Sequence, residues 1–329
     1  MDSSTHIVMG VGLSGLAALD PVIIQNPVTT DALIFGTIIG SVIPDIDTVL
    51  KIKNNATYIR NHRGITHSIP ATLIWPIFIT LVLKIVFPQM NGFHVWLWTF
   101  LAVFLHVFVD IFNSYGTQAL RPITKKWIAL GIINIFDPFI FGIHILGFCI
   151  WFFYGHSGIV FLIIYFILIG YYLLKIHQHH RAVNIVKEKI PNVQAVYLSP
   201  TMKSQQYHVA VRTDYQLIAG EIKGREVTIF DSFNRKSLPK TPLLKAATQD
   251  KNLHAFLSFS PIYRWEVQEN NAYTEVRLID LRYYSKGHYP FVAIAWVNPQ
   301  LKIKSSFTGW VYSEEKLKKK LMLAINDYC

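Results

Sequence analysis

Apolar residues form long runs in the first half of the chain, separated by short polar stretches. The runs are residues 6–24, 32–44, 69–87, 95–113, 128–153 and 158–175. A helix that crosses a membrane needs about 20 mostly apolar residues, and the last four runs approach or reach that length. The first two are shorter and rich in glycine, which permits close backbone approach. The pattern predicts about six membrane segments, with the first two packed as a helical hairpin.

The pattern changes near residue 190. Strand-like runs rich in β-branched and aromatic residues follow at 193–199, 206–213, 216–233 and 273–284. Helical patterns cover 243–259 and 313–326, the second opened by Ser313 as its N-cap. We therefore predict an α-helical membrane domain over residues 1–180. A small soluble α+β domain over 190–329 follows it, with a mostly antiparallel sheet and two helices.

Composition agrees with this division. The chain is 52% hydrophobic and 16% charged, whereas soluble domains carry about 25% charged residues. Residues 1–175 have a net charge of +2 and residues 176–329 a net charge of +9.

Cys149 and Cys329 are the only cysteines, so we expect neither a disulfide framework nor a cysteine-type zinc site. The first residues lack a basic region and a cleavage site, so we expect them to stay attached.

The distribution of Lys and Arg predicts the orientation. Basic residues gather in the loops 51–67 and 121–126 and after residue 175, whereas 25–31, 88–94 and 154–157 have none. Short cytoplasmic loops carry the excess of Lys and Arg. We expect a multi-pass protein of the inner membrane with both termini in the cytoplasm.

Several acids and imidazoles interrupt or border the apolar runs, where charged groups are costly and by default indicate function. The candidates are His6, Asp45, Asp47, His62, His67, His106 and Asp110. His106 and Asp110 are four residues apart, so one helix face presents both. In the predicted topology all of these residues lie at the cytoplasmic side. That topology rests on Lys and Arg alone, so the position of the acids and imidazoles supports it independently.

Imidazole and carboxylate without thiolate favour Zn²⁺ or Mn²⁺. The candidates exceed what one tetrahedral zinc ion uses, so we expect two or more ions, an arrangement that suits phosphoester hydrolysis. In that reaction Asp45 or Asp47 accepts the proton of the attacking water, and Arg63 binds a phosphate oxygen. Thr66 and Ser68 are expected to orient the ligands.

Other interpretations stay open. The residues from Asp45 to His67 would also suit a structural salt-bridge network. His94, His144 and His156 are expected to be interface or packing residues, and the histidines at 177, 179 and 180 a solvated cap beside the membrane. Asp137 either breaks a helix or joins the site.

The first half of the chain resembles the YdjM-type family of inner-membrane, metal-dependent hydrolases. The matching pieces are Thr5-His6, Ile43–Asp47, His62–Ser68, Leu105–Asp110, Tyr115-Gly116 and Arg121-Pro122. The resemblance covers about residues 1–175 and leaves the C-terminal domain outside. That family is in turn distantly similar to zinc phospholipases C and S1/P1-type nucleases. This similarity implies several zinc ions and hydrolysis of phosphodiesters or phospholipids, with His106 and Asp110 in place of a helix-borne His/Glu pair.

We therefore expect a membrane-bound hydrolase acting on a phosphoester or lipid head group at the cytoplasmic face. The alternative is a non-catalytic regulator or scaffold with a structural metal site, whose C-terminal domain binds a protein partner. Nucleic acid is not favoured, because no recognition motif is present. A transporter is less favoured, because transporters place polar groups near the midplane.

Overall fold

The computed structural model describes residues 1–285 and 287–324. The chain forms two compact units. The first contains Met1–Asp47, Arg63–Arg181 and Met202–Ser204, and we call it the helical unit. The second contains Thr48–His62, Ala182–Thr201 and the chain from Gln205 onward, and we call it the sheet unit. The short segment 48–62 is thus separated from its flanking sequence and grouped with the C-terminal half.

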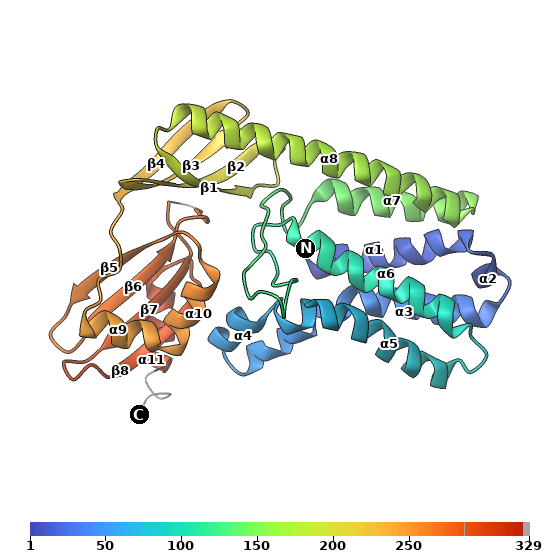
Figure 1. Ribbon diagram of the computed structural model, residues 1–329, viewed down its shortest axis with the longest axis horizontal. Helices are drawn as coiled ribbons and strands as arrows, with labels where there is room; N and C mark the ends of the chain where they lie inside the picture. Colours follow the sequence, from blue (N-terminus) through green and yellow to red (C-terminus); the bar gives the residue numbers. More distant parts are fainter. Residues whose placement is uncertain (286, 325–329) are drawn as a thin grey trace. The chain divides into compact units, whose positions relative to one another are not determined.

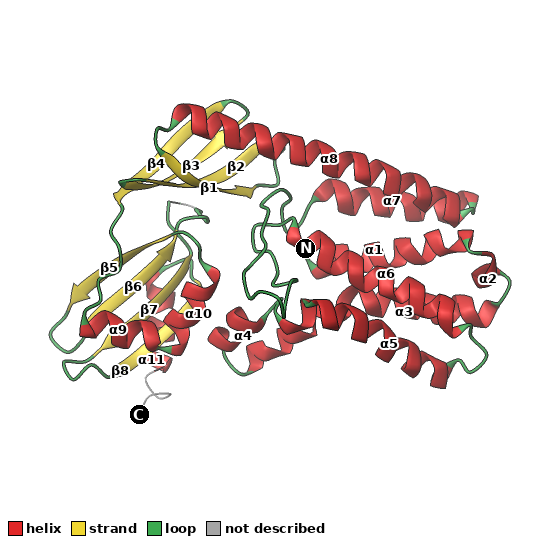
Figure 2. Ribbon diagram, in the orientation of Figure 1, coloured by secondary structure: helices red, strands yellow, loops and turns green. Residues whose placement is uncertain are grey.

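The helical unit is built from apolar helices (Figures 1 and 2). They are α1 (Ser3–Leu16), α2 (Pro21–Ile24), α3 (Pro27–Val42), α5 (Ile69–Val86), α6 (Gly92–Ile111), α7 (Pro138–Tyr154) and α8 (Ser157–Lys189), with the 3₁₀ segments η1 (Ala17–Leu19), η2 (Ile43–Ile52) and η3 (Ile65–His67). Four helices in the described chain are long and apolar enough to cross a membrane: Pro27–Ile52, Ile69–Val86, Gly92–Ile111 and Ser157–Lys189. Ser3–Leu19 and Pro138–Tyr154 are shorter apolar helices. The helical membrane character is confirmed, and the total of six segments stays a prediction.

Small residues allow the helices to approach closely. α1 packs on α3, and α3 packs on α6, as the glycine-rich start of the sequence predicts. A Cβ added at Gly10 would lie 2.8 Å from the Thr37 carbonyl oxygen and would also collide with Ser41. One at Gly40 would lie 3.1 Å from the Thr99 carbonyl oxygen. Close packing brings α1, η2 and α6, which all carry candidate ligands, into one bundle.

The predicted apolar segment 128–153 is only partly helical. Its helix, α7, begins at Pro138, and the Asp137 carboxylate caps it by accepting from the amides of Phe139 and Ile140. The residues before α7 are irregular, because their main chain bonds to the C-terminal end of α6. There the Leu130 amide donates to the Ile111 carbonyl at 2.9 Å. The Tyr171 hydroxyl also donates to Asp137, so Asp137 is a helix cap within a local hydrogen-bond network.

The sheet unit contains two four-stranded antiparallel sheets, whereas the strand pattern predicts one mostly antiparallel sheet. The first has the order β1 (Val193–Pro200), β2 (Gln206–Thr213), β3 (Gln216–Lys223) and β4 (Glu226–Asn234). The last turns of α8 pack on it through Ala182, Ile185 and Val186. Residues 216–233 form the β3–β4 hairpin, which turns at Gly224 with a φ of 61°, as the turn dipeptide Lys223-Gly224 predicts.

The second sheet and its helices form an α/β layer structure. Its strands are β5 (Tyr263–Glu269), β6 (Thr274–Asp280), β7 (Phe291–Val297) and β8 (Ile303–Trp310), and its helices are α9 (Pro242–Gln249), α10 (Lys251–Phe259) and α11 (Glu314–Ala324). One predicted helix over 243–259 is two helices, because the Asp250 carboxylate caps a new start at α10. Ser313 accepts from the Lys316 amide as the predicted cap of α11. α4 (Asn55–Asn61), in a stretch predicted to be a loop, packs on α10 and β8.

Candidate metal centre

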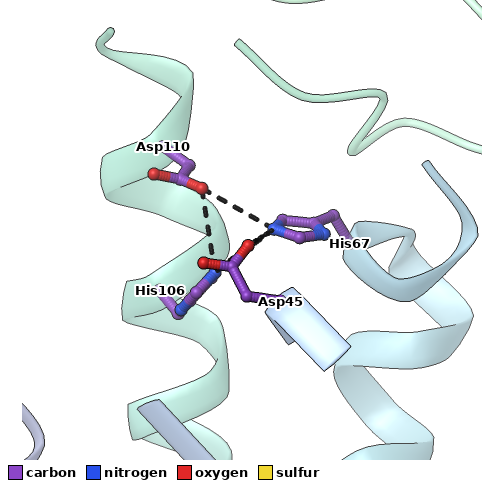
Figure 3. A group of neighbouring side chains, drawn as sticks. All are labelled: Asp45, His67, His106 and Asp110. Carbon is purple, nitrogen blue, oxygen red and sulfur yellow. Dashed lines mark hydrogen bonds and ion pairs between the residues drawn. The ribbon is translucent and has the colours of Figure 1, made fainter. Parts of the chain in front are cut away.

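Four side chains of the helical unit converge on one point (Figure 3). Asp45 lies in η2, where the chain leaves α3 after Pro44, and His67 lies in η3. His106 and Asp110 are one turn apart on α6, as their spacing predicts. Each of the four offers one ligand atom, and these atoms all lie within 4.8 Å of one another.

The distances match the edges of a coordination tetrahedron. Zinc–ligand bonds of about 2.0–2.2 Å put neighbouring ligands of a tetrahedron about 3.3–3.6 Å apart. The Nε2 atoms of His67 and His106 are 3.2 Å apart. Asp45 Oδ1 is 3.5 Å and 3.7 Å from them, and Asp110 Oδ2 is 3.6 Å and 3.7 Å from them. His67, His106 and Asp110 therefore have nearly the spacing of three ligands of a tetrahedral ion, and Asp45 Oδ1 lies beside the two imidazoles.

Hydrogen bonds fix which ring nitrogens face this point. His106 Nδ1 lies 2.6 Å from the Ser41 carbonyl oxygen, which can only accept. The Nδ1 atom therefore carries the proton, and Nε2 presents a lone pair.

A relay through Thr66 does the same for His67. The Thr66 hydroxyl donates to Asp47 Oδ2 at 2.6 Å, so its oxygen accepts from His67 Nδ1 at 3.1 Å. His67 is fully buried, and this desolvation lowers its pKa to about 3, which keeps the imidazole neutral. Two lone pairs and two carboxylates thus face one another, and a cation would satisfy all four.

Asp47 occupies a supporting position. Its Oδ2 accepts from the Arg63 amide at 2.8 Å as well as from Thr66, and it is 3.9 Å from His67 Nδ1. Partners of this kind hold a ligand ring in orientation. Asp47 thus holds the segment that carries His67, and its predicted role as a ligand, beside Asp45 and His62, stays a prediction. Ser68, predicted to orient a ligand, instead accepts from the Ala71 amide and caps α5.

Arg63 contacts the same Asp110 oxygen that faces the two imidazoles. Its Nε is 3.2 Å from Asp110 Oδ2, and its Nη2 donates to the Met1 carbonyl at 3.0 Å. The amino nitrogen of Met1 also contacts the Asp110 carboxylate. The contacts of the Met1 main chain and of the Ser41 carbonyl could not be predicted, because main-chain atoms have no residue-type signature.

His6 borders the cluster. Its ring stacks on His106 with centroids 3.7 Å apart, and its Nε2 lies 3.4 Å from Asp110 Oδ1. His6 is buried, and neither ring nitrogen has a hydrogen-bond partner in the described chain. A buried imidazole without such a partner is well suited to a further ion on this side of Asp110.

His62 forms a second candidate group with Asp45 and Asp47, in which one ligand atom of each residue lies within 4.8 Å of the others. Its ring also stacks on Tyr58 with centroids 4.5 Å apart. Its predicted ligand role stays a prediction. His94 pairs with Asp20 at 2.6 Å, and His144 Nδ1 donates to the Ile140 carbonyl at 2.7 Å within its own helix. These two have the packing and interface environments that the sequence predicts.

Apolar helices that enclose a buried His/Asp cluster define a helical membrane protein with a candidate metal centre. The chain belongs to the YdjM inner membrane protein family, whose model matches residues 1–182. Residues 191–233 match the YfhP middle domain, and residues 242–321 match the YfhP C-terminal alpha/beta plait domain.

A relative from Bacillus subtilis (strain 168), described as the uncharacterized protein YfhP, is 54% identical over 324 residues. The match covers 98% of this chain and 99% of the relative, so all three regions are shared. No solved structure matches the chain. The match to the YdjM family confirms the predicted resemblance, and the similarity to phospholipases and nucleases stays an expectation.

Proposed function

We propose that the protein is a membrane-bound, metal-dependent hydrolase that acts on a phosphoester. The observation that carries this proposal is the set of lone pairs formed by His67, His106 and the two carboxylates around one point. Arg63 and the Met1 amino group already compensate the Asp110 carboxylate, and a bound cation would also compensate Asp45 and the two imidazole lone pairs, which are costly to bury.

The ligand types favour Zn²⁺, with Mn²⁺ as the second choice. We assign His67, His106 and Asp110 as the ligands of one ion, since three protein ligands and an open position are typical of catalytic zinc sites. His6 and Asp110 would hold a second ion. Ions held by these residues would supply Lewis-acid activation of a water molecule and neutralise charge on the phosphate.

Asp45 is the better candidate for the proton acceptor. Its side chain is 16% exposed, whereas that of Asp47 is 4% exposed. Its buried Oδ1 atom accepts no hydrogen bond in the described chain, whereas Asp47 already accepts two. Asp45 can therefore take a proton without breaking an existing bond. Arg63, which lies beside Asp110, would bind a phosphate oxygen of the substrate.

A lipid head group is the natural substrate, because the cluster lies where the apolar helices α3 and α6 end and α5 begins. Exposed Ile46 and Ile65 flank Asp45 and His67 in sequence, which suits a substrate with an apolar part. The Lys and Arg of the loops favour the cytoplasmic face of the cell membrane for this end.

The test compares the purified, metal-loaded protein with its Asp45→Asn variant. The substrates are a chromogenic phosphodiester in solution and phospholipid vesicles. We expect hydrolysis by the wild type, and a loss of at least about 100-fold in Asp45→Asn, since general acid–base groups contribute about 10²–10⁴-fold. Metal content should be retained in the variant. A wild type that holds metal and cleaves neither substrate would favour the regulator with a structural metal site.

A further inference from the structure

The segment 48–62 connects the two units twice. It leaves the helical unit after Asp47 and re-enters it at Arg63, but it is grouped with the sheet unit. Both residues at which it is attached are among those that support the candidate metal centre. The segment is therefore joined through the chain to the residues that support the site and is itself part of the sheet unit.

Helix α4, in the middle of this segment, is seated on the α/β plait. It packs on α10 and β8, and Ala56 in its first turn is 4% exposed. The Asn55 side chain donates to the Thr308 carbonyl at 3.4 Å. The next residue is Gly309, with a φ of 142°, and a Cβ there would lie 3.3 Å from Asn55 Nδ2. Glycine is thus needed where α4 meets β8.

The two ends of the segment meet in the helical unit. The Arg63 amide donates to Asp47 Oδ2, which closes the segment into a loop. The same oxygen accepts from Thr66, and Thr66 contacts the His67 ring. Arg63 also holds Asp110. A shift of either end of the loop would therefore change the orientation of two proposed ligands.

We propose that the α/β plait is the positioning domain of the metal centre. By holding α4, it fixes the main chain at Asp47 and Arg63, and through Thr66 it fixes His67. Ala56 and Gly309 are positioning residues, because they act through this loop and touch no ligand. The inference builds on the metal centre of the proposed function and gives the C-terminal half a role in controlling it.

The test uses the full-length protein in detergent with two variants that unseat α4. Gly309→Val adds a branched side chain at a positive φ against Asn55, and Ala56→Glu places a charge at a buried position. Arg60→Ala, at an exposed position of the same helix, is the matched control. Hydrogen exchange is measured across residues 62–69, and Co²⁺ binding is followed by affinity and visible spectrum.

We expect faster exchange across 62–69 in both variants, with α5 and α6 still protected. Co²⁺ affinity should fall about 10–100-fold, the effect typical of lost ligand support, with an altered visible spectrum and no change in Arg60→Ala. If Gly309→Val unfolds the plait, amide exchange also becomes faster in β6 and β7. The proposal still requires faster exchange across 62–69 in that case.

The inference is overturned if α4 exchanges freely in the variants while exchange across 62–69 and Co²⁺ affinity equal those of the wild type. A wild type that binds no Co²⁺ would count against the metal centre itself. In that case the exchange measurement still decides whether the plait holds the loop.

Discussion

The Nε2 atoms of His67 and His106 lie 3.2 Å apart, although the two residues are 39 positions apart in the chain. Each ring has its Nδ1 atom engaged, at Thr66 and at the Ser41 carbonyl. A hydrogen bond between the two rings would need an additional proton, and burial disfavours the charged form of His67. A divalent ion satisfies both lone pairs without that proton.

Thr66→Val should weaken metal binding while leaving the fold intact. The substitution keeps the side-chain shape and removes the hydroxyl that joins Asp47 to His67. Loss of such a supporting bond costs about 10–100-fold in metal affinity. Titration with Co²⁺ or Zn²⁺ measures the effect.

Thr80→Val provides the matched control for that substitution. The Thr80 hydroxyl lies in α5 and has no hydrogen-bond partner in the described chain, so its loss should not change the affinity. Equal affinities for Thr66→Val and the wild type would show that the hydroxyl relay does not orient His67.

Gly10→Ala should destabilise the helical unit. The added methyl group would collide with Ser41 and approach the Thr37 carbonyl oxygen to 2.8 Å, which forces α1 away from α3. Overpacking of this kind costs about 1–3 kcal/mol, and thermal unfolding in detergent measures it. Gly142→Ala, where a Cβ meets no atom within 4 Å, should unfold at or above the wild-type temperature. Equal destabilisation by both changes would contradict the role of close packing.

Metal should stabilise the folded protein. An ion that binds only the folded state raises the free energy of unfolding by about 2.7 kcal/mol when its free concentration is about 100 times Kd. We expect the melting temperature to rise with added Zn²⁺ and to fall with a chelator. In His67→Ala the melting temperature should be the same in both conditions, because a ligand is missing. A wild-type melting temperature that changes neither with Zn²⁺ nor with the chelator would argue against a metal site in the folded protein.

The candidate ligands could be predicted because polar groups are conspicuous inside apolar runs. His6, Asp45, His67, His106 and Asp110 all stand out in this way, and the structure brings them together. The supporting role of Asp47 could not be predicted, because it depends on the main-chain amide of Arg63. The Ser41 carbonyl that orients His106 also has no signature in the sequence.

The strands of the C-terminal half were recognisable, but their division into two sheets was not. Alternation of side chains identifies a strand and does not specify its neighbour. Between β4 and β5 the chain forms α9 and α10, and their separation depends on the single cap Asp250. The attachment of α4 to the plait is a contact between residues far apart in sequence, so local patterns could not indicate it.

The most direct test is the metal content of the purified full-length protein by elemental analysis. The account predicts at least one zinc or manganese ion per chain in the wild type and in His94→Ala, whose imidazole pairs with Asp20 away from the cluster. It predicts loss of that ion in His106→Ala. A wild type without stoichiometric metal after loading, or a His106→Ala variant that retains the wild-type amount, would contradict it.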